Sequence, residues 1–326
     1  GMSASYLNEI EKGKKYPKAE KVMQLSEALG VSYDNLINLK LERQLAPVGE
    51  ILRANILSEL PLDIFGIDKG KLVEIISSAP LKVSAFIGTL MQMADHYNLT
   101  QENFYFAALR SYQEMHENHF SEIEESAKKF RKKLDLGVSS ALNSSILGEV
   151  LEERFGYRVG NHELSEYPEL GNIRSVFISD AKKILVNDQL ADDQKAFLFA
   201  KEIGYQHLEL TGDRALMTPW PRATSFDHVL NNSQASYFAG ALLIPFADLA
   251  SRLEKFFSLK KWNGDHLLDM MDNYRSSPEM FMVRLTNVIP KYFGLNSLFF
   301  LRFDHDAAIN AVSPKKELFL SRNQGR

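Results

Sequence analysis

Residues 192–210 read DDQKAFLFAKEIGYQHLEL, and this stretch decides how the second half of the 326-residue chain is organised. Its apolar residues recur at the spacing of one helical face. They are Ala196, Phe199, Ala200, Ile203 and Leu208. Asp192 or Asp193 can cap the N-terminus, because a short polar side chain accepts hydrogen bonds from the first backbone N–H groups. The stretch therefore predicts an amphipathic helix with one face toward a core.

The polar positions of this helix can be laid over the zinc-binding pattern H-E-x-x-H. In that pattern two histidines one helical turn apart bind the metal, and the glutamate acts on a metal-bound water. Glu202 falls on the glutamate, whereas Lys201 and Tyr205 fall on the histidines. An ammonium repels a dication, and a neutral phenol is a poor zinc ligand. His207 lies about 200° further round the helix than Tyr205, so we expect that it does not replace it.

Two neighbouring stretches extend the pattern. Residues 173–187, IRSVFISDAKKILVN, predict two short strands around a turn. Residues 229–245, VLNNSQASYFAGALLIP, predict a helix closed by Pro245. In this order the segments resemble the ImmA/IrrE-type metallopeptidase domain, with Ala235 and Phe238 among the matching positions. The resemblance implies a zincin-like domain with a short β-sheet.

The same resemblance implies a third zinc ligand, an acid, just before Ala235. No carboxylate stands there, because the residues are Asn232, Ser233 and Gln234. We therefore expect a degenerate peptidase domain that is not an enzyme and holds neither metal nor cofactor. The candidates for lining a pocket that binds a small anionic or acyl effector are Lys201, Glu202, Tyr205 and Asn232. The alternative is that these residues form an ordinary surface or a structural ion pair.

Residues 3–30, SASYLNEIEKGKKYPKAEKVMQLSEALG, predict two short helices around a basic turn. Ser3 or Ser5 can cap the first helix, and Gly13 can end it. The stretch resembles the XRE-type (Cro/repressor-like) helix-turn-helix, which implies that Ser3–Glu11 is a recognition helix. By this resemblance the base-facing residues are Ala4, Ser5 and Asn8, and the phosphate-facing residues are Tyr6, Lys12, Lys14 and Lys15. Ser3 completes the predicted DNA-binding set, and the alternative is a solvated helical hairpin.

In the XRE family two helices precede the recognition helix, whereas this chain begins at it. We expect the chain to be shortened at that end, to bind DNA weakly as it stands, and to bind an operator once those helices are restored. The polar end SRNQGR, 321–326, similarly leads us to expect a further C-terminal region.

The remaining segments predict helices from about residue 43 to residue 133 and strands near the C-terminus. His116 and His119 could pair on a metal, although the interspersed acids favour a polar helix face. The basic run 128–133 predicts a solvated helix end. The stretches 297–303, SLFFLRF, and 317–321, ELFLS, predict strands.

Together these segments predict a mainly α protein with a small β component (α+β) in four parts. These are a partial helix-turn-helix at 1–42, a helical linker and dimerisation region at 43–135, a degenerate IrrE-like domain at 136–250 and a sensor-like α/β segment at 251–326. The combination resembles long bacterial XRE regulators with an IrrE-like domain, including regulators of short-chain fatty-acid metabolism.

Composition narrows the range of functions that the chain can have. The chain carries 38 basic and 42 acidic residues, a formal net charge of −4, and no cysteine. The charge excludes wholesale coating of nucleic acid, so contact with DNA must be local. We expect a cytoplasmic homodimeric transcriptional regulator without a membrane partner. The alternatives are a zinc-dependent metallopeptidase that cleaves a repressor partner and a non-catalytic interaction scaffold.

Overall fold

The computed structural model describes residues 3–12, 14–15, 17–31, 101–135, 137, 141–160, 162–210, 216–219, 223–295, 299–306 and 311–319. Most of the predicted helical region 43–135 lies outside the described residues. The chain divides into two compact units, Gly1–Thr100 and Gln101–Arg326. Within the described residues helices dominate and strands are few, which confirms the predicted α+β class.

The first unit contains the two predicted short helices, α1 (Ala4–Glu11) and α2 (Ala19–Leu29). Ser3 is the N-cap of α1, and its hydroxyl accepts a hydrogen bond from the Tyr6 N–H at 3.3 Å. Gly30 ends α2 with a positive φ of 65°, which glycine adopts without a Cβ clash.

The second unit is built on eight described helices. They are α8 (Gln101–Met115), α9 (Ser121–Lys133), α10 (Ser144–Phe155), α11 (Asp192–His207), α12 (Phe226–Leu243), α13 (Phe246–Phe257), α14 (Asp265–Asn273) and α15 (Pro278–Phe293). Two short 3-10 helices, η2 (Glu163–Glu166) and η3 (Pro168–Leu170), lie between the first and second strands of the sheet in the sequence. None of the described helices is long and apolar enough to cross a membrane.

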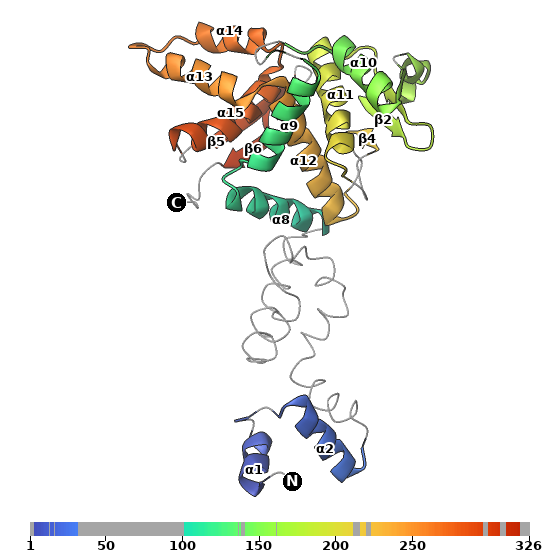
Figure 1. Cartoon of the computed structure of the whole chain (residues 1–326), viewed down its shortest axis with the longest axis vertical. Helices are drawn as coiled ribbons and strands as arrows, with labels where there is room; N and C mark the ends of the chain where they lie inside the picture. Colours follow the sequence, from blue (N-terminus) through green and yellow to red (C-terminus); the bar gives the residue numbers. More distant parts are fainter. Residues whose placement is uncertain are drawn as a thin grey trace. The chain divides into compact units, whose positions relative to one another are not determined.

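Four short strands form a mixed sheet in the order β1-β3-β2-β4. They are β1 (Arg158–Gly160), β2 (Ser175–Ile178), β3 (Lys183–Val186) and β4 (Met217–Thr218). β1 runs parallel to β3, while β2 is antiparallel to both of its neighbours. The predicted C-terminal strands are present as the antiparallel pair β5 (Phe299–Asp306) and β6 (Ala311–Phe319). Figure 1 shows the mixed sheet beside α10 and α11.

Helix α11 begins at Asp192, one residue earlier than it would if Asp192 were its N-cap. The N-cap is Ala191, whose N–H donates to the Gln194 side chain at 3.3 Å. Asp192 lies in the first turn and accepts hydrogen bonds from Ser144 at the start of α10. The predicted cap is therefore wrong, because the Asp192 carboxylate joins α11 to α10 and does not cap its own helix.

Helices α11 and α12 pack closely at Gly204. A Cβ placed on Gly204 would lie 3.0 Å from the Ala235 carbonyl oxygen and 3.1 Å from the Phe238 ring. Gly204 and Ala235 are both buried, as is the apolar stripe that the sequence predicts at Ala196, Phe199, Ala200 and Ile203. The two segments that carry the sequence resemblance therefore form one helix–helix contact in the core.

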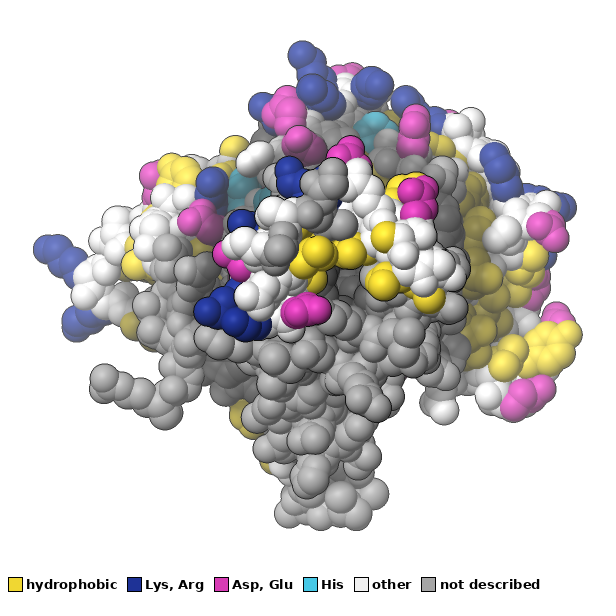
Figure 2. Space-filling view, turned by 90° about the horizontal axis from the view of Figure 1, so that it is seen from below, with side chains coloured by type: hydrophobic (Ala, Val, Ile, Leu, Met, Phe, Trp, Pro, Cys, Tyr) yellow, Lys and Arg dark blue, Asp and Glu magenta, His cyan; other side chains and the backbone are white. Residues whose placement is uncertain are grey.

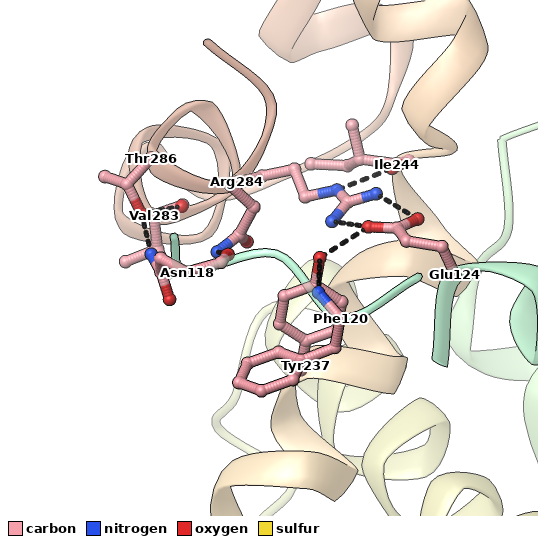
Figure 3. Close-up of polar contacts among 9 residues, drawn as sticks. Asn118, Phe120, Glu124, Tyr237, Ile244, Val283, Arg284 and Thr286 are labelled. Carbon is pink, nitrogen blue, oxygen red and sulfur yellow. Dashed lines mark hydrogen bonds and ion pairs between the residues drawn. The ribbon is translucent and has the colours of Figure 1, made fainter. Parts of the chain in front are cut away.

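A buried ion pair joins α9 to α15 (Figure 3). Arg284 is 1% exposed, and its Nη1 and Nη2 atoms lie 2.7 and 2.8 Å from the two carboxylate oxygens of Glu124. Its Nε donates to the Ile244 carbonyl at 2.9 Å, and the Tyr237 hydroxyl donates to Glu124 at 2.7 Å. Burial alone would raise the pKa of Glu124, but Arg284 outweighs burial and holds that pKa below its ordinary value.

Candidate functional site

A small cavity lies between α11 and the sheet strands β2, β3 and β4. Its apolar lining consists of Phe177, Ile184, Leu198, Leu216 and Met217, and its polar lining includes Lys201, Glu202 and Tyr205. The space open to the centre of a water molecule is about 20 Å³, which is room for about one water. Three of the four residues predicted to line an effector pocket therefore share this cavity.

Glu202 is the buried acid of the cavity, at 5% exposure. The Tyr157 hydroxyl donates a hydrogen bond to its Oε1, and the Gln206 amide donates to the Tyr157 oxygen at 2.8 Å. The carboxylate is thus held by a short hydrogen-bonded chain, in keeping with the rule that buried charges are paired or hydrogen-bonded. Sequence reasoning missed Tyr157. The only local sequence signal for Tyr157 is that it is an aromatic residue directly after Gly156, the glycine that ends α10.

Lys201 and Tyr205 lie one helical turn apart on α11 and face each other. The Lys201 Nζ atom is 5.9 Å from the centroid of the Tyr205 ring, within the range of a cation–π contact. Tyr205 is buried at 3% exposure, and its hydroxyl donates to the Asn232 side-chain oxygen at 3.4 Å. Asn232 does not line the cavity but contacts it through Tyr205. The phenol oxygen is therefore engaged as a hydrogen-bond donor.

The two residues that follow Asn232 make contacts with α8. The Gln113 amide donates to the Ser233 hydroxyl at 3.1 Å, and Gln234 hydrogen-bonds to Tyr112. Across the parts of the chain that the structure describes, no group of three or more His, Asp or Glu side chains is close enough to hold a metal ion.

The histidines of this unit that the sequence singles out pack against aromatic rings. His207 lies 4.7 Å from Phe130 and 5.4 Å from Phe238, centroid to centroid, and burial lowers its pKa. It is not among the residues that line the cavity, as its position on the helix predicts. His116 packs on Tyr112 at 4.7 Å, and His119 packs on Phe246 at 5.1 Å. The two lie in the turn after α8, so the structure supports neither the metal pair nor a continuous helix face there.

Most of the predicted DNA-binding side chains, on α1 and in the residues that flank it, are exposed to solvent. Exposed among them are Ser3, Ser5, Asn8, Lys12, Lys14 and Lys15. Tyr6 is half-buried, and the side chain of Ala4 lies outside the described residues. The Lys15 Nζ atom lies 3.3 Å from Glu9 and 5.5 Å from the Tyr6 ring. Since this ion pair is exposed, it is weak and can exchange for a phosphate.

Comparison with known proteins agrees with both sequence resemblances. Residues 1–36 match the helix-turn-helix family model, and residues 152–286 match the model of the IrrE N-terminal-like domain. The structure is similar to that of a Mycobacterium tuberculosis transcriptional regulator, with 18% identity and a TM-score of 0.47. The similarity covers 66% of this chain and 60% of that chain. No curated protein matches the sequence.

Proposed function

Because the chain carries an XRE-type helix-turn-helix and an IrrE-like domain, we propose that it is a DNA-binding transcriptional regulator. The observation that carries the proposal is the exposed face of α1, where Ser5 and Asn8 lie beside three exposed lysines. Polar side chains on such a helix suit the edges of bases, and lysines suit phosphates. We further propose that the protein acts as a homodimer, since readers of this class bind two half-sites. We place the self-contact in the region 43–135, which the sequence predicts to be helical.

We propose that the IrrE-like domain does not cleave peptides. Lys201 and Tyr205 occupy the two histidine positions of the zinc pattern, and Asn232, Ser233 and Gln234 offer no carboxylate. The Tyr205 phenol is committed to Asn232, and the Glu202 carboxylate is held by Tyr157. This donor set does not fit a zinc ion, which prefers imidazole, thiolate and carboxylate ligands. Glu202 then has no metal-bound water to activate.

The cavity instead suits a sensor role. Lys201 supplies a cation at one wall, and the apolar walls suit a short hydrocarbon portion, so we propose a small anionic or acyl effector. The space holds about one water, so an effector must widen it. Leu216, which is 48% exposed at its edge, is the residue we expect to move. A purely structural role for the domain, in an interaction scaffold, is the competing function.

Direct DNA binding tests the regulator proposal. The full chain is titrated against random-sequence duplexes at low salt, where weak binding can be measured, and the titration is repeated at increasing salt. Lys14→Ala should weaken binding to all duplexes and lower the slope of log K against log salt by about one. Asn8→Ala should leave the slope unchanged, because the Asn8 side chain carries no charge.

Lys128→Ala is the matched control, because Lys128 is an exposed lysine on α9 whose ion pair with Glu125 resembles that of Lys15. It should leave both the affinity and the slope as they are. If Lys14→Ala and Lys128→Ala behave alike, α1 does not contact DNA and the scaffold function is favoured.

A further inference from the structure

Helix α14 exposes an acidic stripe with an apolar residue in its middle. Asp265, Leu268, Asp269 and Asp272 are exposed and follow the i, i+3, i+4, i+7 spacing of one helical face. Leu268 is 55% exposed, whereas Met270 on the opposite face is buried at 5%. Figure 1 shows α14 at the outer edge of the Gln101–Arg326 unit. The stripe therefore faces solvent.

The loop before α14 has the opposite charge. Lys260 and Lys261 are exposed, and neither forms an ion pair among the described residues. Trp262 follows them and is 76% exposed, with its ring packed edge-on against Phe256 at 5.2 Å. A tryptophan exposed to this degree is uncommon on a monomer surface and is typical of a contact residue in an interface.

We propose that this surface binds the same surface of a second copy of the chain, with the two α14 helices antiparallel about a two-fold axis near Leu268. The helix is about 13 Å long, with the basic loop at its N-terminal end and Asp272 at its C-terminal end. An antiparallel pair places Lys260 and Lys261 beside the partner's Asp272, and the symmetry repeats this contact. Leu268 meets the partner's Leu268, and Trp262 covers the end of the partner helix.

The charge pattern favours a second copy over other partners. An isologous interface must be complementary to itself, and here each end of the surface carries both a cation and an anion, which the opposite charges at the other end of the partner can meet. Arg275, exposed beyond the C-terminal end of α14, adds a cation within reach of the partner's Asp265. Nucleic acid or an anionic membrane would instead meet the three aspartates of the stripe. Since the charges are exposed, the contact is weak and sensitive to salt.

The α14 contact rests on the proposed function in one respect: a protein that binds two DNA half-sites must be a dimer. It lies outside the region 43–135 and adds a self-contact to any that this region makes. Its test therefore uses no DNA.

Single cysteines can test the contact, because the chain contains none. Helices that pack 8–10 Å apart bring facing Cα atoms on a two-fold axis within the range of a disulfide. In the full chain, Leu268→Cys should form a disulfide-linked dimer under mild oxidation at low salt. Met282→Cys is the control, because Met282 is also on a helix and 43% exposed. We expect Leu268→Cys to cross-link at least about tenfold faster, and the advantage to shrink as salt is added.

Reversing the charges of the surface provides a second test of the contact. Lys260→Glu with Lys261→Glu should remove the advantage of Leu268→Cys, and adding Asp269→Lys with Asp272→Lys should restore it. Equal cross-linking of the two cysteines, or no rescue by the second reversal, would overturn the contact. A chain that cross-links but shows no lysine-dependent DNA binding keeps the contact and loses the regulator function. A chain that binds DNA but does not cross-link keeps the regulator function and loses the contact.

Discussion

At the scale of single residues, Gly204 in α11 has a role in helix packing that is independent of any metal chemistry. Gly204 lies two residues after Glu202, within the stretch that can be laid over the zinc-binding pattern. Here the backbone of Ala235 and the ring of Phe238 lie so close that a side chain would fit only if one of them moved by a few tenths of an ångström. The glycine is therefore required by the approach of α11 to α12, and it would be required with or without a metal. On the proposal that this domain holds no metal, the α11–α12 contact can keep the fold with Lys201 and Tyr205 at the two histidine positions of the pattern.

The first prediction follows from this contact. Gly204→Ala should lower the free energy of unfolding by roughly 1–3 kcal/mol, because the added methyl meets backbone atoms that cannot move independently. Gly148→Ala in α10 is the control, since its Cβ would meet only the Phe199 ring at 3.7 Å. There the helix gains propensity, by at most about 1 kcal/mol. Urea unfolding compares the two, and an equal loss in both variants would contradict the packing role of Gly204.

Residues of the candidate site differ in how far the sequence predicts them. Lys201 and Tyr205 could be placed on one helix face, because their spacing of four is local information. Tyr157 could not be foreseen, because Glu202, to which it donates a hydrogen bond, lies 45 positions later in the chain. Arg131 was expected at a solvated helix end but is 4% exposed, and it donates to the Leu242 and Gly137 carbonyls at 2.6 Å each. That expectation was wrong because α12 covers it.

At the scale of elements, α11, α12 and the β2–β3 hairpin follow the sequence patterns closely. The helical pattern through residues 101–133 breaks, however, since α8 ends at Met115 and Glu117 and Asn118 have positive φ of 53° and 52°. Asn118 is fixed by contacts to α15: its amide donates to Thr286, and its carbonyl accepts from Asn287, both at 3.0 Å. These contacts join residues that are about half the chain apart in sequence. The local sequence therefore does not predict the turn.

The packing of α11 on α9 leads to a prediction of how stability depends on pH. Burial of His207 against Phe130 lowers its pKa below 6.5, so the folded state disfavours its protonated form. Burial lowers the pKa of His119 in the same direction. Their contribution to stability is complete above the unfolded pKa of about 6.5 and is lost as the pH falls from that value through the lower folded pKa. Glu124, whose folded pKa is lowered, contributes in a separate and more acidic window.

Unfolding by urea at a series of pH values between 8 and 5 measures this effect. The midpoint should fall over the lower half of that range, and His207→Gln should flatten the fall. His266→Gln, at an exposed position on α14, should leave the profile unchanged. A profile that His207→Gln and His266→Gln alter alike would show that the buried ring does not carry the dependence.

At the scale of the whole molecule, the chain joins a unit that matches a helix-turn-helix model to a unit that matches the model of the IrrE N-terminal-like domain. On the face drawn in Figure 2, basic and acidic side chains are interspersed among the coloured residues. With a net charge of −4, this agrees with DNA contact confined to a local surface such as α1. Composition and motifs therefore predict the class of molecule. They do not reveal the self-complementary surface of α14, which depends on which residues the core leaves exposed.

The zinc content of the full chain tests the central claim, that a regulator uses this domain without its metal chemistry. The protein is equilibrated with excess zinc, desalted and analysed for bound metal, beside a variant that combines Lys201→His, Tyr205→His and Asn232→Glu. We predict far less than one zinc per wild-type chain, and a rise toward about one in the variant, which regains imidazole and carboxylate donors. About one zinc per wild-type chain, lost on Glu202→Gln or Tyr205→Phe, would contradict the account.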